Sequence, residues 1–191
     1  MPLTVADLES AFKTYLEEME RCERAKCYWA LLHMLVALPD ICAALQTVSG
    51  EAGDGGAYRA WCKNNFSGQH LVSAEDRYAI RCAVLHQGRT TPPPGGRYLS
   101  YSFVQPLTSG SPVHNWVTPG ERNMTLDVGE MSRDTRAAMR GWFQKLQLPG
   151  NKELSARVER HLPHLAREKP KSFSPAPPGI SITTTFSSTS S

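Results

Sequence analysis

The sequence predicts a mainly α-helical protein that carries a small antiparallel β-sheet and ends in a disordered tail. Apolar residues recur at three- and four-residue spacing through most of the first 90 residues and again over residues 132–147, as in helices packed on one face. Residues 97–105 instead alternate apolar and polar side chains, which is typical of a half-buried strand. From residue 167 the composition changes to Lys, Pro, Ser and Thr, which cannot build a core. We therefore expect one helical domain over residues 1–166 with a β insertion at about 97–129, followed by a disordered segment over 167–191.

Length and composition are those of an ordinary globular protein. The chain has 191 residues, of which 40% are hydrophobic and 20% charged, and this is enough for one substantial core. Its net charge of +3 is too small to indicate nucleic-acid binding by itself. The chain starts Met-Pro-Leu-Thr without a basic and apolar leader, and its longest apolar run, residues 28–38, contains His33 and is too short for a membrane span. We expect a cytoplasmic protein with no membrane segment.

The cysteines do not form a recognisable framework. Their number is odd and none belongs to a Cys-x-x-Cys pair, so we expect reduced thiols and neither disulfides nor a zinc site. They are Cys22, Cys27, Cys42, Cys62 and Cys82. We expect no metal and no other cofactor.

Four helices are expected in the first 90 residues. The first carries an apolar stripe at helical spacing, made of Leu8, Phe12, Tyr15, Leu16 and Met19. The second starts at about Ala25, is apolar on nearly every side, and should be the central helix of a bundle. Pro39 either kinks this helix or begins a separate short one over residues 39–46, because proline lacks the backbone donor of an interior helix position. A short third helix is expected over residues 58–66.

The fourth helix, residues 73–88, has the clearest boundaries. Ser73 is a good N-cap, and Asp76 places a negative charge in the first turn, near the positive end of the helix dipole. Gly88 suits the left-handed conformation that ends many helices.

This fourth helix carries an unusual pair of polar residues. At 100° per residue, Arg81 and His86 lie about 140° apart around the helix axis. The arc between them is neither charged nor clearly solvent-loving, and it is made of Tyr78, Cys82 and Leu85. The opposite arc is apolar as well, and a helix that is apolar on two sides is normally covered on two sides. We therefore expect the first arc to be the interface of a homodimer.

The β insertion is expected to begin with the strand at residues 97–105. Residues 113–117 are a candidate second strand and residues 124–128 a third, so we predict a small antiparallel sheet. A long ordered loop is the alternative, since two or three strands alone are only marginally stable. One face of the first strand should hold Leu99, Tyr101 and Phe103, and the other Tyr98, Ser100 and Ser102.

Two helices are expected after the insertion. Ser132 is a candidate cap for the first, whose apolar stripe contains Thr135, Ala138, Met139, Trp142, Phe143 and Leu146. A weaker final helix ends by Pro163 and carries Leu154, Val158 and Leu162 on one side.

Most familiar catalytic motifs are absent from the sequence. There is no Gly-rich phosphate loop, no Gly-x-Ser-x-Gly elbow and no His-Glu-x-x-His helix. His161 and His164 are three residues apart, but Pro163 separates them and no neighbouring acid completes a site. Arg81 and His86 remain, and they are the two groups needed to cleave RNA without a metal. The imidazole can transfer the proton of a ribose hydroxyl or of the leaving oxygen, and the guanidinium can hold the phosphate.

The run Arg81-Cys82-Ala83-Val84-Leu85-His86, continued by Gln87-Gly88, resembles the Arg-x4-6-His signature of the HEPN superfamily. The stretches Leu38-Pro39-Asp40-Ile41-Cys42 and Tyr58-Arg59-Ala60-Trp61 also resemble an uncharacterised bacterial branch of it. The resemblance covers roughly residues 5–90. It implies a helical bundle that dimerises through the motif helices, so that two Arg/His pairs form one metal-independent endoribonuclease site.

The resemblance has further implications. Many members of the superfamily are toxins or phage-defence effectors, which implies RNA as a substrate and an antitoxin or nucleotidyltransferase as a partner. Arg81 and His86 would be catalytic, and Arg77 of the same helix and Arg89 just after it are candidate RNA contacts. Other members are inactive, so an RNA-binding, nucleotide-binding or protein-interaction module is the alternative. Cys82 departs from the polar residue that often follows the arginine in active members.

Overall fold

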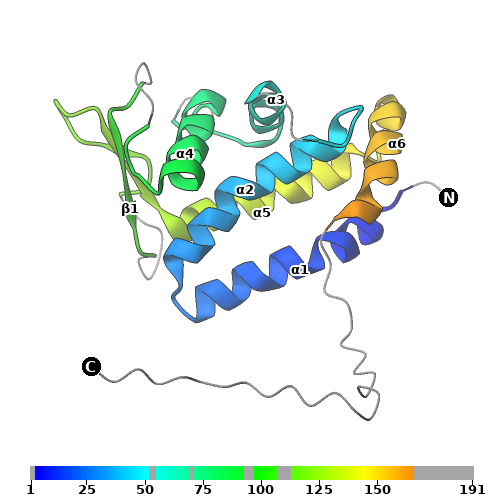
Figure 1. The fold of residues 1–191 in the computed structure, drawn as a ribbon, viewed down its shortest axis with the longest axis horizontal. Coiled ribbons are helices and arrows are strands. Elements are labelled where there is room, and N and C mark those ends of the chain that lie inside the picture. Colours follow the sequence, from blue (N-terminus) through cyan, green and yellow to red (C-terminus); the bar gives the residue numbers. More distant parts are fainter. Residues whose placement is uncertain (1–2, 52–54, 69–70, 93–96, 107–112, 166–191) are drawn as a thin grey trace, which may run out of the picture.

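The structure is a computed structural model that describes residues 3–51, 55–68, 71–92, 97–106 and 113–165. The segment 167–191, expected to be disordered, lies outside the described residues. Within the described ranges the protein is mainly helical, with a small sheet at one end of the helices (Figure 1). The prediction of a mainly α-helical protein with a small sheet is therefore confirmed.

The helices and strands follow one another in the order α1, α2, α3, α4, β1, β2, β3, α5, α6. The helices are α1 (Val5–Arg24), α2 (Tyr28–Gln46), α3 (Gly55–Asn65), α4 (Ala74–Gln87), α5 (Val128–Lys145) and α6 (Lys152–His161). The strands are β1 (Ser100–Val104), β2 (Trp116–Val117) and β3 (Asn123–Asp127). Short 3-10 turns flank α6 at Pro149–Asn151 and Leu162–His164.

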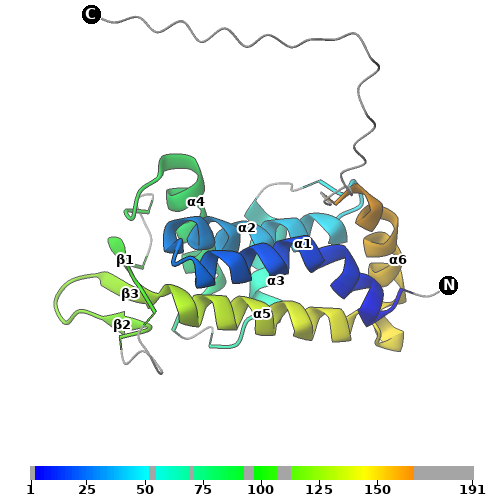
Figure 2. The ribbon, with the colours of Figure 1, turned by 90° about the horizontal axis from the view of Figure 1, so that it is seen from below.

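Helix α2 is the central helix, as its sequence predicted. It contacts α1, α3, α4, α5 and α6, and in Figures 1 and 2 it runs beside the long helices α1 and α5. It begins at Tyr28 and not at Ala25, because Lys26 has a φ of 56° and turns the chain between α1 and α2. Pro39 lies inside α2, so the alternative of a separate helix over residues 39–46 is wrong.

By length and composition alone, α2 is also long and apolar enough to span a membrane. Over its most apolar window the mean hydropathy is 1.6, and 50% of that window is buried within the protein. A central core helix meets the same criteria because it is apolar all round. Here the apolar surface of α2 is used in contacts with the other helices.

The centre of the core is aromatic. Trp142 of α5 meets Phe12 of α1 edge to face, with ring centroids 6.1 Å apart, and meets Trp61 of α3 in the same manner at 6.0 Å. Phe143 packs beside them, 5.5 Å from Phe12. All four side chains are at most 2% exposed. These rings join three helices that are distant in the sequence.

The sheet is mixed, and the prediction of an antiparallel sheet is wrong for one of its two strand pairs. Strand order is β1-β3-β2, with β1 parallel to β3 and β2 antiparallel to β3. Alternation shows which side chains share a face but does not indicate the direction of a partner strand. Strand β2 comes between β1 and β3 in the sequence but lies at the edge of the sheet, antiparallel to β3, and β1 and β3 point the same way.

The alternation predicted for the first strand holds only from residue 100 onwards. Tyr101 is buried and Phe103 packs against the core, as expected. Leu99 is 60% exposed, however, while Tyr98 is buried. The ladder with β3 begins at Ser100, so the two residues before it are not held in the alternating pattern of the sheet.

Helix α5 begins five residues earlier than its sequence predicted, because its N-cap is Asp127 and not Ser132. Asp127, the last residue of β3, caps it by accepting hydrogen bonds from the backbone of Gly129 and Glu130. Ser132, expected to be the cap, is buried inside the helix, and its hydroxyl donates to the carboxylate of Glu23 on α1. The strand and helix therefore join without a loop.

The cysteines allow a test of the core. All five are free thiols; Cys42 and Cys62 are buried and Cys27 is exposed. Burial raises the pKa of the Cys62 thiol to about 12, so near neutral pH it stays protonated and unreactive. We expect iodoacetamide to alkylate Cys27 in the native protein and to reach Cys42 and Cys62 only after denaturation. Peptide mass spectrometry measures each site, and equal labelling of Cys27 and Cys62 in native protein would contradict this packing.

Candidate functional site

The caps predicted for α4 are present. The hydroxyl of Ser73 accepts the backbone N–H of Asp76, and the Asp76 carboxylate accepts the backbone N–H of Ser73 at 2.9 Å, which makes a capping box. At the other end Gly88 is left-handed, with a φ of 58°, and the N–H of Arg89 bonds to the carbonyl of Ala83. Both ends of the helix that carries the Arg81–His86 pair are therefore set by local sequence.

The structure brings Arg81 and His86 into direct contact. The long arginine side chain spans the arc between them, and its Nη1 lies 2.6 Å from Nε2 of His86. Its Nη2 donates to Oδ2 of Asp40 on α2 at 2.5 Å. The Arg81 and Asp40 side chains are 18% and 22% exposed, and His86 is exposed. The Arg81–Asp40 ion pair is thus largely buried, while the imidazole of His86 is accessible to a ligand.

The chemistry of the guanidinium sets the direction of this hydrogen bond. A guanidinium can only donate, so Nη1 of Arg81 is the donor and Nε2 of His86 the acceptor. Burial alone would lower the pKa of Arg81, but the hydrogen bond and charge of Asp40 offset this and leave that pKa raised. The arrangement presents a fixed cation beside an imidazole whose Nε2 lone pair points at it.

Asp40 belongs to the candidate site, and the sequence alone did not predict this. It lies 41 positions before Arg81 and was notable only as part of the stretch around Pro39. No spacing rule connects residues on two different helices. Its role follows from the packing of α2 against α4.

The residues proposed for a dimer interface lie partly within the protein's own packing. Tyr78 and Leu85 are half-buried against the core of the same chain, and Cys82 is half-buried as well. The Tyr78 ring lies under the guanidinium of Arg59 on α3, 4.3 Å from the ring centroid. Gly55 approaches the same ring so closely that a Cβ there would collide with it. Tyr78 therefore faces α3 of the same chain, and the interface remains a prediction.

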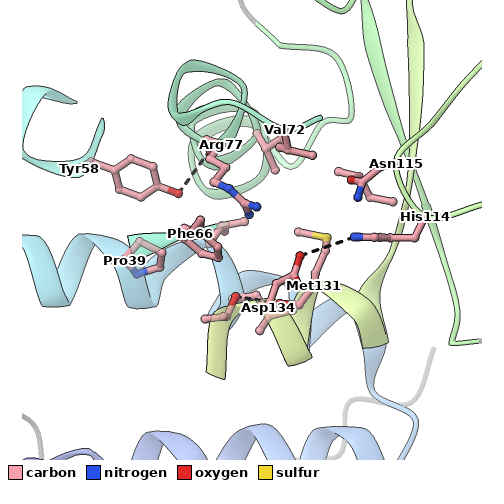
Figure 3. Close-up of a pocket in the computed structure, with 14 residues that line it drawn as sticks. Pro39, Tyr58, Phe66, Val72, Arg77, His114, Asn115, Met131 and Asp134 are labelled. Carbon is pink, nitrogen blue, oxygen red and sulfur yellow. Dashed lines mark hydrogen bonds and ion pairs between the residues drawn. The ribbon is translucent and has the colours of Figure 1, made fainter. Parts of the chain in front are cut away.

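The two other arginines proposed as RNA contacts lie in different environments. Arg89 is exposed immediately after Gly88, near the His86 end of α4. Arg77 instead points inwards, and its guanidinium stacks 3.6 Å from the centroid of the Phe66 ring (Figure 3). Burial lowers its pKa. We therefore withdraw Arg77 as a surface contact for RNA and retain Arg89.

The pocket that Arg77 enters joins α4 to the insertion. His114 accepts the backbone N–H of Asp127 at Nδ1, and its Nε2 lies 3.7 Å from the Asp134 carboxylate of α5 (Figure 3). Asn115 contributes a buried side-chain oxygen with no hydrogen-bond partner in the described ranges. The free space is about 20 Å³, which is room for about one water molecule. The pocket is therefore too small for a substrate and belongs to the structural framework.

In the described part of the chain, no three residues among His, Cys, Asp and Glu lie close enough together to hold a metal ion. Comparison of the chain with family models, with curated proteins and with solved structures found no match. Arg81, His86 and Asp40 are therefore the groups whose arrangement bears on function.

Proposed function

We propose that the protein is a metal-independent endoribonuclease whose reacting groups are Arg81 and His86. The observation that supports this best is the 2.6 Å contact between the guanidinium and Nε2 of an exposed imidazole. A cation and a proton acceptor at one point on the surface are the two groups that a phosphodiester needs for cleavage by its own 2′-hydroxyl.

In this reaction the 2′-oxygen of the ribose displaces the 5′-oxygen of the next nucleotide from the phosphorus. Nε2 of His86 takes the proton of the ribose 2′-hydroxyl, and the 2′-oxygen forms a bond to the neighbouring phosphorus. The bond from phosphorus to the 5′-oxygen breaks, and a second acid protonates that oxygen. Arg81 stabilises the charge that builds on the phosphate oxygens. The products are a 2′,3′-cyclic phosphate and a free 5′-hydroxyl.

Asp40 acts as a positioning residue in this proposal. Its carboxylate holds Nη2 of Arg81, which keeps the guanidinium from turning away into solvent. When a phosphate replaces His86 as the partner of Nη1, the Asp40 contact stays in place. Substrate binding therefore frees the imidazole lone pair for the ribose hydroxyl.

A second copy of the chain would supply the acid. One chain offers one imidazole at this position, whereas the reaction needs a base and an acid. In the homodimer proposed from the family resemblance, the His86 of the second copy takes the second role. The same resemblance is the support for a toxin or phage-defence role, which growth arrest on induced expression would test.

The direct test is cleavage of a single-stranded RNA by purified protein in excess EDTA. We expect fragments that end in 2′,3′-cyclic phosphate, identified by mass spectrometry, and no cleavage where the scissile ribose is replaced by 2′-deoxyribose. The second substrate is the matched control because it differs only in the attacking hydroxyl. Intact wild-type RNA after prolonged incubation would reject the nuclease, and RNA that is bound but not cut would favour a silent RNA-binding module.

A further inference from the structure

Asp40 also lines a large cavity toward the end of α2 that lies near α6, far from the sheet (Figure 1). The cavity holds about 510 Å³ and lies between the second half of α2, the loop at Ser49 and Gly50, and the α6 end of the chain. Its volume is in the range of small-ligand pockets, about 300–1,000 Å³. Asp40 lines this cavity and also accepts a hydrogen bond from Arg81, so one residue links the cavity to the Arg81–His86 pair.

The α6 wall of this cavity is rich in hydrogen-bond donors. Arg160, His161 and His164 all line it. Arg160 is exposed and forms no ion pair in the described part of the chain, and Nε2 of His161 is buried there without a hydrogen-bond partner. The sequence alone offered no acid near the two histidines, but the fold places Asp40 opposite them. That carboxylate is already neutralised by Arg81, so the balance of charge in the cavity favours an anion.

One imidazole of the wall is fixed by the backbone. Gly50 has a φ of 77° and packs against the ring of His161, where a Cβ would collide with Nδ1. Glycine is the residue that adopts this left-handed backbone at low cost and also leaves room for the imidazole ring of His161. The facing wall of α2 is apolar, formed by Ile41, Ala44 and Leu45. The cavity therefore combines a nonpolar surface from α2 with the Arg160 guanidinium from α6.

We propose that this cavity binds the nucleotide of a single-stranded RNA next to the scissile phosphate. The base would lie against Ile41, Ala44 and Leu45, and its phosphate would meet Arg160, with His164 beside it. A single strand fits this cavity because its bases are free to turn out into a pocket, which a paired base is not. The inference rests on the proposed function, since it takes RNA as the substrate of the adjoining Arg81–His86 contact.

The test measures binding separately from cleavage. A fluorescent single-stranded RNA with 2′-deoxyribose at every position that is cut serves as a ligand that cannot react, and fluorescence anisotropy gives its affinity at several salt concentrations. We expect Arg160→Ala to weaken binding about tenfold, as loss of one charged phosphate contact does. The slope of log affinity against log salt should fall by about 0.7, the value for one phosphate on a single strand.

Two further variants complete the experiment. Arg24→Ala is the matched control, because Arg24 is also exposed and lies at the end of α1, outside the cavity. Ala44→Leu fills the cavity with a residue that suits a helix and leaves every charge unchanged. We expect the control to leave affinity and salt slope unchanged and the filling variant to weaken binding. With cleavable RNA, Arg160→Ala should raise KM and leave kcat nearly constant.

The possible results separate the two proposals. If wild-type protein cuts RNA and neither Arg160→Ala nor Ala44→Leu alters binding or KM, the cavity proposal is overturned and the nuclease stands. If RNA is bound through the cavity but never cut, the nuclease is rejected and the cavity is an RNA-binding site. Equal losses for Arg160→Ala and Arg24→Ala would show nonspecific charge attraction and would also overturn the cavity proposal.

Discussion

Replacing His86 with alanine is expected to reduce RNA cleavage by about 10²- to 10⁴-fold, the usual contribution of a general acid–base group. The imidazole is exposed, and its one hydrogen bond within the described residues is with Nη1 of Arg81. Its removal should therefore leave the free energy of unfolding nearly unchanged. The measurements are the initial rate of cleavage in EDTA and a urea unfolding curve on the same preparation.

Gln87→Ala is the matched control for this variant. Gln87 is the next residue of α4 and is exposed, so the change alters the same helix turn without removing a proton-transfer group. It should cut RNA at the wild-type rate. Cleavage that survives His86→Ala at full rate would show that a different group, or a contaminating nuclease, is responsible.

Replacing Trp142 with alanine is expected to lower the free energy of unfolding by about 3–5 kcal/mol, the usual cost of removing a large aromatic side chain from a core. Trp142 is 1% exposed and meets rings from both α1 and α3, so its removal leaves a cavity where three helices join. This is a large share of the stability of a typical domain, about 5–15 kcal/mol. Urea unfolding followed by circular dichroism measures the loss.

Two comparison variants make this result specific. Trp142→Phe keeps an aromatic ring in the core and should cost less, about 1–2 kcal/mol. Leu148→Ala removes an apolar side chain that is 54% exposed and should change stability little. Similar losses from Trp142→Ala and Leu148→Ala would mean that the aromatic cluster is not the centre of the core.

Local signals predicted the helices well because helix formation depends on neighbouring residues. The ends of α4 follow from Ser73 and Gly88, whose side chain and backbone freedom satisfy the open hydrogen bonds of the helix ends. The same signals misplaced the start of α5. Ser132 is a good cap by type, but it is inside the helix because Asp127, at the end of β3, caps it first. Composition alone does not decide which of two candidate caps is used.

In the sheet, the alternation of apolar and polar residues predicted which side chains share a face but not the direction of the strands. Alternation placed Tyr101 and Phe103 on one face of the first strand, and Tyr101 is buried opposite Met124 of the neighbouring strand. The parallel direction of β1 and β3 depends on the path of the chain between them. That path is a property of the whole insertion and not of any one strand.

By itself the sequence determined the helical character of the protein, the central position of α2, and the presence of Arg81 and His86 on one well-capped helix. These features depend on spacing along one element, which can be read residue by residue. Only the tertiary structure decided that Asp40 holds Arg81, that Arg77 points inwards, and that His161 and His164 line one cavity with Asp40. Contacts between distant helices depend on how buried surfaces pack together, and no spacing within a single helix records that arrangement.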